Sequence, residues 1–158
     1  MKKKKELVKQ LKDLITKGNA HAPFEDAIAK VPSAIRSKVP AKLPYSIWQL
    51  VEHMRIAQWD IVEFCRNPKH VSPKWPEGYW PASAKPADDE EWHNSIEQIR
   101  RDQADFLELL EDKDADLFTP FEHGDGQNLL REALLIADHN SYHTAEIIVI
   151  RRLLGDWK

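Results

Sequence analysis

Four long segments of the chain repeat apolar residues at the three- and four-residue spacing of an α-helix. They cover residues 3–17, 46–66, 88–112 and 127–154. Such spacing gives each helix one apolar face, which has to be buried against another element. Alternation typical of strands is scarce, and Asp125-Gly126 precedes a helical segment instead of joining two strands. The sequence therefore predicts an all-α fold, a four-helix bundle.

Residues that start and stop helices stand at the ends of these segments. Gly18-Asn19 closes the first segment, and Asn67-Pro68 ends the second, which Ser46 can cap. A weaker helical stretch, residues 24–37, lies between the first two segments. At 158 residues the chain is expected to form a single domain, residues 1–158.

The longest irregular segment, residues 67–87, joins the second and third long segments. It holds five of the ten prolines together with Trp75, Tyr79 and Trp80. A connection of this length allows a crossover, so that the second and third helices run parallel. Its aromatic residues favour packing over disorder. Two interpretations stay open: a crossover loop held down by its tryptophans, or one that also forms a wall of a substrate pocket.

Bulk composition excludes several classes of protein. The net charge of −3 argues against a general nucleic-acid-binding protein, and the run Lys2–Lys5 reads as the solvated start of a helix. A single cysteine, Cys65, cannot form an internal disulfide and fits a reducing compartment. The chain has no apolar run of membrane-spanning length and no secretory signal. We expect a cytoplasmic protein without membrane contact.

Three histidines carry the strongest functional signal. His139 and His143 are four residues apart, which places both imidazoles on one face of a helix. His53 stands between Leu50 and Ala57 on the inward face of another segment. Three imidazoles from two facing helices can bind a divalent metal and leave a position for water or substrate. The other four histidines (His21, His70, His93 and His123) are interpreted as surface residues.

The inward face of the last segment is apolar at its ends and polar in its middle. Its seven-residue repeat comprises Leu129, Glu132, Ile136, His139, His143, Glu146, Ile150 and Leu153. Burying ionisable groups is costly unless they are paired or bind a metal, so we expect this layer to face His53. Glu146 lies on the same face and can ligate the metal, orient water, act as general base or bond a histidine. Glu52, off the corresponding face, is expected to be solvated.

Three stretches of the chain resemble the DinB-like (damage-inducible) superfamily of metal-binding four-helix bundles, which is related to the bacillithiol transferases. Residues 44–53 (PYSIWQLVEH) resemble the ligand segment of the family's second helix. Residues 75–81 (WPEGYWP) resemble the connection in one branch, and residues 137–143 (ADHNSYH) resemble the ligand-bearing last helix. The resemblance extends from about residue 5 to Trp157. One departure is Ala145-Glu146, where relatives often carry Gly-Gln.

The resemblance implies an up-down-down-up bundle, with a divalent metal held by His53, His139 and His143, and a homodimer formed through helices. Zinc, nickel or another first-row metal would suit imidazole ligands. The metal can activate a low-molecular-weight thiol for transfer or isomerisation, as in characterised relatives, or it can activate water with Glu146 as base. Candidate walls for an unidentified small-molecule substrate are Trp48, Tyr142, Trp75 and Trp80. The alternative is a non-catalytic, stress-related dimer that binds metal or ligand.

Overall fold

A computed structural model describes residues 2–157 of the chain, and within that range it contains helices and no strand. The four long helices are α1 (Lys2–Lys17), α4 (Ile47–Arg66), α5 (Asp89–Glu111) and α6 (Leu129–Leu153). They lie where the apolar spacing predicted helices, and the all-helical prediction is confirmed. No helix in the described range is long and apolar enough to cross a membrane.

Polar caps fix where the long helices begin. The Ser46 hydroxyl accepts a hydrogen bond from the Gln49 amide at 3.1 Å, and the Gln49 side chain accepts one from the Ser46 amide at 3.0 Å. Asp88 and Asn128 accept equivalent bonds at the starts of α5 and α6. These contacts satisfy amide groups that have no partner inside the first helical turn. At the other end of α1, Gly18 adopts φ +64°, a conformation that suits glycine and ends the helix.

The weak stretch at residues 24–37 is not one helix, as the sequence suggested, but two short ones. They are α2 (Phe24–Ile28) and α3 (Ser33–Arg36). Lys30 adopts φ +54°, and Pro32 follows Val31. A proline disfavours helical geometry in the preceding residue and lacks an amide hydrogen, so one helix cannot pass through this point.

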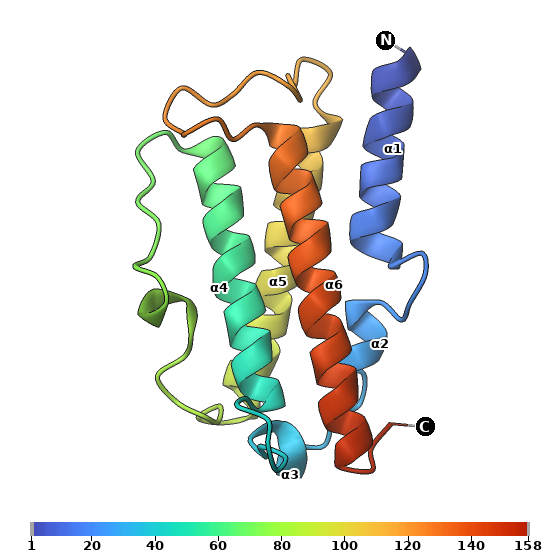
Figure 1. Cartoon of the computed structure of the whole chain (residues 1–158), viewed down its shortest axis with the longest axis vertical. Coiled ribbons are helices and arrows are strands. Elements are labelled where there is room, and N and C mark those ends of the chain that lie inside the picture. The colour runs from blue at the N-terminus through green and yellow to red at the C-terminus, as the bar shows by residue number, and fades with distance from the viewer. Residues whose placement is uncertain (1, 158) are drawn as a thin grey trace.

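The long helices pack around a common interior (Figure 1). Helices α4 and α6 lie side by side with α5 behind them, and α1 lies against α6 on the side away from α4. Followed by colour, α4 and α5 run in one direction, whereas α1 and α6 run in the other. The connection from α4 to α5, here named the strap (residues 67–88), follows the outer side of α4. It contains the short 3-10 helix η1 (Glu77–Tyr79).

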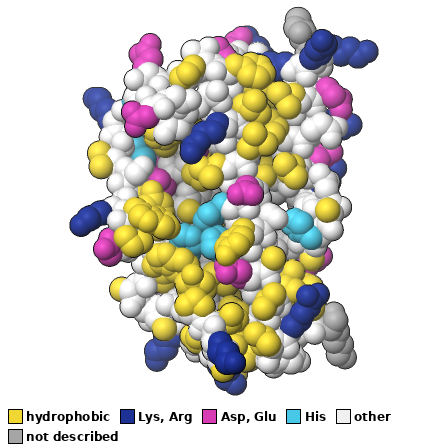
Figure 2. All heavy atoms as spheres, viewed as in Figure 1, with side chains coloured by type: hydrophobic (Ala, Val, Ile, Leu, Met, Phe, Trp, Pro, Cys, Tyr) yellow, Lys and Arg dark blue, Asp and Glu magenta, His cyan; other side chains and the backbone are white. Residues whose placement is uncertain are grey.

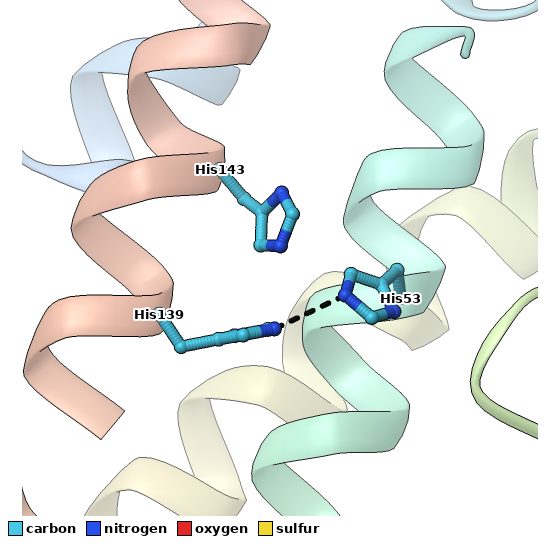
Figure 3. Close-up of side chains that lie close together, drawn as sticks. All are labelled: His53, His139 and His143. Carbon is cyan, nitrogen blue, oxygen red and sulfur yellow. Dashed lines mark hydrogen bonds between the residues drawn. The ribbon is translucent and has the colours of Figure 1, made fainter. Parts of the chain in front are cut away.

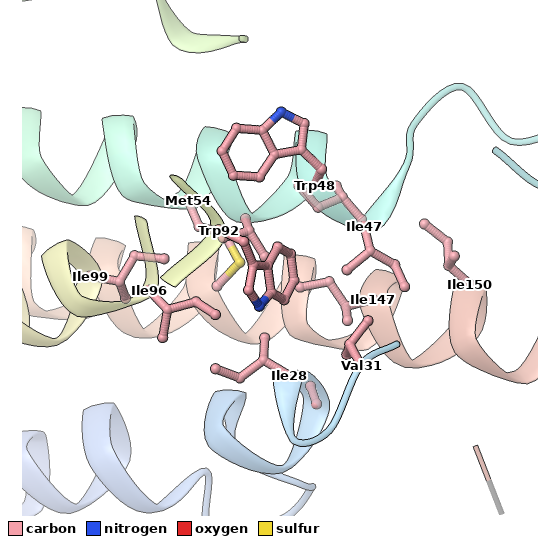
Figure 4. Packing of buried hydrophobic residues seen from close by; sticks show 13 residues of the cluster. Ile28, Val31, Ile47, Trp48, Met54, Trp92, Ile96, Ile99, Ile147 and Ile150 are labelled. Atoms are coloured by element: carbon pink, nitrogen blue, oxygen red, sulfur yellow. The ribbon is translucent and has the colours of Figure 1, made fainter. Parts of the chain in front are cut away.

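The core divides into two apolar clusters. The first joins the start of α4 to the start of α5 and the end of α6, and includes Trp48, Trp92 and Ile147 (Figure 4). The second lies at the other end of the bundle, around Phe106 and Ile136. The buried face of α4 belongs to the first cluster up to Met54 and to the second from Ile61. That of α6 belongs to the second up to Ile136 and to the first from Ile147.

A polar layer fills the space between the two clusters. Buried Gln58 of α4 donates a hydrogen bond to the Ile99 carbonyl of α5 at 2.6 Å and accepts one from Asn140 of α6 at 2.7 Å. His53 and His143 lie in the same layer and are buried. The polar middle that the sequence indicated in α6 therefore coincides with a polar segment of α4. Hydrogen bonds across three helices offset the cost of burying these groups.

Two further details of the sequence interpretation differ from the structure. Leu153 was placed on the inward face of α6, but 61% of it is exposed. A seven-residue repeat drifts around a straight α-helix by about 20° per repeat, and Leu153 stands at the far end of that drift. Glu52 was expected to be solvated, but it is buried and forms two hydrogen bonds with Arg55, at 2.7 and 2.9 Å. The paired guanidinium makes that burial tolerable.

Candidate metal centre

His53 lies on the buried face of α4, in the second turn after the Ser46 cap. Leu50, about one turn before it, and Met54, directly after it, belong to the first apolar cluster. Because the cap fixes where the helix begins, and these neighbours fix its rotation, the imidazole is turned towards α6. Only 4% of His53 is exposed.

His139 and His143 lie one above the other on α6. Their ring centroids are 4.5 Å apart, as the four-residue spacing requires. His143 is buried, and His139 is partly exposed. Both rings face His53, with centroid distances of 4.9 Å from His139 and 4.6 Å from His143.

The three imidazoles converge from two helices on one point (Figure 3). The Nε2 atoms of His53 and His139 are 3.1 Å apart. One nitrogen from each of the three rings lies within 4.8 Å of the other two. The sequence prediction that these three side chains meet is therefore matched by the structure, although the two helices are far apart along the chain.

Hydrogen bonds to the other ring nitrogens set the orientation of two imidazoles. The Nδ1 atom of His53 lies 2.9 Å from the Tyr79 carbonyl oxygen, which can only accept, so Nδ1 carries the proton. The Nδ1 atom of His143 lies 2.7 Å from the Glu146 carboxylate. In both rings Nε2 is then left with a free lone pair. Ligand histidines in metalloproteins commonly bond carbonyl or carboxylate groups in this way.

Burial keeps the three rings uncharged at neutral pH. It lowers the pKa of His139 to about 4, with a further contribution from the neighbouring rings of His143 and His53. Burial and the nearby His53 also lower the pKa of His143 to about 4. The pKa of His53 is lowered by burial against the opposing effect of its bond to Tyr79. Neutral imidazoles are the form that binds metals.

The donor set fits a first-row divalent metal. Two Nε2 atoms bound to one tetrahedral ion at about 2.0–2.1 Å would lie roughly 3.3 Å apart. The 3.1 Å between His53 and His139 is close to that value. Since Nε2 of His53 has no proton, Nε2 of His139 must donate to it when no ion is present, and an ion would take the place of that proton.

The Glu146 carboxylate does not lie with the three converging histidine nitrogens. Its carboxylate contacts His143 Nδ1, and its side chain is 29% exposed. Burial raises the pKa of Glu146, while the nearby His53 opposes this effect. Of the roles that the sequence left open, hydrogen bonding to a histidine is the one that its position fits.

A cavity of about 390 Å³ adjoins the three histidines. Trp75 and Trp80 line it, as expected of candidate pocket walls, and Trp80 stacks on His53 with the two rings 4.1 Å apart. Figure 2 shows histidine side chains at the middle of this face of the molecule, with hydrophobic side chains around them. Acidic side chains also lie close to the histidines on this face.

The other two candidate pocket residues lie elsewhere. Trp48 is buried in the first apolar cluster, where its ring centroid is 6.4 Å from that of Trp92. Tyr142 is 63% exposed on α6, with its ring edge-to-face against His143 and outside the cavity lining. An aromatic residue near a helical face can serve the core or the surface equally well, and spacing alone does not separate these roles.

Three residues close to the centre were missed or misread. His70 was interpreted as a surface residue, but its side chain is only 8% exposed and bonds to Asp60. Asp60 and Tyr79 line the cavity beside the histidines. A signal for Asp60 was present, since it stands seven residues, two helical turns, after His53 and so shares its face. Nothing local in the sequence shows that the strap brings His70 and Tyr79 to this point.

Comparison with known proteins identifies the family. No curated protein and no solved structure showed significant similarity to the chain. The family model described as the DinB superfamily matches residues 19–147. The match is shorter at both ends than the resemblance noted in the sequence, but it covers most of the chain and includes all three histidines. The chain belongs to the DinB superfamily.

Proposed function

We propose that this protein binds one divalent first-row metal ion through the Nε2 atoms of His53, His139 and His143, within an up-down-down-up bundle. The observation that carries the proposal is the convergence of three uncharged imidazoles, two of them buried, at one point. The directions of the helices in Figure 1 support the bundle topology. Imidazole ligands suit zinc, nickel and other first-row ions alike.

We further propose that the metal serves an enzyme acting on a small molecule. Three protein ligands beside a cavity are typical of catalytic metal sites, whereas structural sites are closed by four. The bond between Glu146 and His143 supports this view, because that carboxylate is engaged away from the cluster. When bound, the metal would supply Lewis acidity towards a low-molecular-weight thiol or water. Transferase, isomerase and hydrolase chemistry are all compatible with this arrangement.

The residues around the centre favour a substrate with an apolar body. Tyr45, Trp75, Tyr79 and Trp80 contribute aromatic side chains to the cavity. A pocket of this kind orients a ligand by shape. Glu146 would hold the His143 ring in place, a positioning role for which its hydrogen bond is the support.

A non-catalytic function is the second candidate. The ligands come from α4 and α6, between the two apolar clusters, so a bound ion would cross-link the helices at the polar layer. In that case the metal would mainly stabilise the fold. Metal removal separates the two candidates: it would abolish turnover in an enzyme, whereas in the second case it would only lower the melting temperature.

The metal site itself is tested by His139→Ala. We expect the wild type to bind about one Zn²⁺ or Ni²⁺ per chain, and the variant to lose most of its affinity because one of three ligands is gone. Helical circular dichroism should be unchanged. His93→Ala is the matched control, since His93 is an exposed histidine on α5. Unchanged affinity in His139→Ala, measured by calorimetric titration, would show that the assignment is wrong.

A further inference from the structure

A buried carboxylate of α4, that of Asp60, binds the strap at two points. The Asp60 side chain accepts a hydrogen bond from His70 Nε2 at 2.7 Å on one oxygen and from the Tyr79 hydroxyl at 2.5 Å on the other. His70 and Tyr79 lie at different points of the strap. Asp60 is 8% exposed, and these two bonds offset the cost of burying its carboxylate. One carboxylate thus holds the strap at two points.

Packing fixes both strap residues in place. The His70 ring lies edge-on against Trp59, the residue next to Asp60, with centroids 5.2 Å apart. Tyr79 ends the short helix η1, and its ring centroid is 5.5 Å from that of Trp75. The bonds at Asp60 therefore join groups whose orientations are already restricted.

Tyr79 links Asp60 to the histidine cluster. Its hydroxyl contacts Asp60, while its backbone carbonyl accepts the Nδ1 proton of His53 at 2.9 Å. Asp60 and His53 lie two turns apart on the same face of α4, and Tyr79 bridges them. The neighbouring Trp80 covers the flat face of His53. A single segment of the strap thus determines both the tilt of the ring and the nitrogen that bears its proton.

We propose that Asp60 is a positioning residue for the metal centre, acting through Tyr79 to hold His53 as the Nδ1-protonated tautomer with Nε2 directed at His139. The metal part of this inference rests on the proposed function; the tautomer part does not. Without the Asp60 anchor, packing alone would hold the Tyr79 carbonyl, and its bond to the ring would loosen. His53 would then populate both tautomers, and only one of them presents a lone pair at Nε2.

The test compares variants of the full chain by ¹⁵N-histidine NMR at neutral pH without metal. In the wild type, we expect His53 to show a protonated Nδ1 and an unprotonated Nε2. Asp60→Ala and Tyr79→Phe should both shift His53 towards a mixture of tautomers, because each removes the bond between Asp60 and the Tyr79 hydroxyl. Tyr45→Phe is the matched control for the loss of a hydroxyl in the cavity wall. Asp60→Asn, which keeps an acceptor for Tyr79, should restore the wild-type tautomer at least in part.

A merely structural anchor would lower stability in Asp60→Ala without changing the His53 tautomer. An unchanged tautomer in both Asp60→Ala and Tyr79→Phe would overturn the inference. If Asp60→Ala does not fold, the His53 tautomer in Tyr79→Phe, compared with that in Tyr45→Phe, decides whether the inference holds.

Zinc titration of the same variants separates this inference from the proposed function. If the metal site exists, Asp60→Ala and Tyr79→Phe should bind Zn²⁺ about 10- to 100-fold more weakly than wild type, the usual effect of losing a partner of a ligand histidine. If neither the wild type nor any variant binds zinc, the proposed function fails. The positioning role of Asp60 still stands in that case if the His53 tautomer shifts in the variants. If zinc binds equally to all of them and the tautomer is unchanged, the positioning role fails instead.

Discussion

Glu146 orients the ring of His143. Its carboxylate accepts the Nδ1 proton, which leaves Nε2 free and stiffens the ring against rotation. A carboxylate partner also makes the imidazole a stronger donor. Relatives that resemble this chain often carry glutamine after a glycine here, and a glutamine oxygen can accept the same proton without a charge.

Substitution of Glu146 compares the effects of a carboxylate and an amide at this position on metal affinity. We expect Glu146→Gln to retain one equivalent of metal with affinity reduced by no more than about 10-fold, because a neutral acceptor remains. Glu146→Ala should lose roughly 10- to 100-fold, since His143 then has no acceptor. Competition titration with a zinc chelator measures both. If Glu146→Gln abolished binding while His143→Ala did not, Glu146 would be a ligand rather than a hydrogen-bond partner.

The sequence predicted the three converging histidines better than their surroundings. His53, His139 and His143 were found because helical spacing places them on inward faces, and spacing is a local property. Asp60, His70 and Tyr79 come together through the path of the strap, which depends on tertiary packing. Helical periodicity therefore predicted the cluster but not the network that orients it.

Helices follow the sequence closely where capping and apolar spacing agree. The start of α4 is an example, since Ser46 both caps the helix and donates a hydrogen bond to the Ala84 carbonyl of the strap at 3.0 Å. Where spacing and backbone chemistry disagree, the backbone prevails, as at Val31-Pro32 between α2 and α3. Neither apolar spacing nor capping predicts the course of the strap, because the strap has no helical repeat.

The cap at Ser46 should matter for stability more than for metal binding. Ser46→Ala removes a fully buried hydroxyl. The Gln49 amide and the Ala84 carbonyl then lose their hydrogen bonds to this hydroxyl. We expect a loss of about 1–3 kcal/mol in the free energy of unfolding, with metal stoichiometry retained. Urea denaturation measures the loss. Ser83→Ala, an exposed position in the strap, is the control and should change stability by less than about 0.5 kcal/mol. Equal effects of the two substitutions would contradict the capping role.

At the scale of the molecule, the outer face of α6 carries a row of exposed apolar side chains. Tyr142, Val149 and Leu153 are each between 43% and 63% exposed and follow one another at seven- and four-residue spacing. These side chains follow one side of the helix, where a partner helix would cover them. We propose that two copies of the chain pair through this face, in keeping with the homodimer implied by the family resemblance.

Charge placed in this row should separate the two copies. We expect Val149→Glu to convert a dimer into a monomer, because a carboxylate would be buried against an apolar partner. Light scattering coupled to size-exclusion chromatography gives the mass. Val71→Glu, at an 84% exposed position on the strap, is the control and should leave the mass unchanged. A wild-type protein that is monomeric at high concentration would contradict the dimer.

One ion held by three imidazoles should be visible in an anomalous difference map of zinc-soaked crystals, recorded at the zinc absorption edge. We expect a single peak about 2.0–2.1 Å from Nε2 of His53, His139 and His143. Glu146 should remain on His143 Nδ1, with the fourth position open to the cavity. A map without a peak at the histidines, or with Glu146 bound to the ion as a fourth ligand, would contradict it.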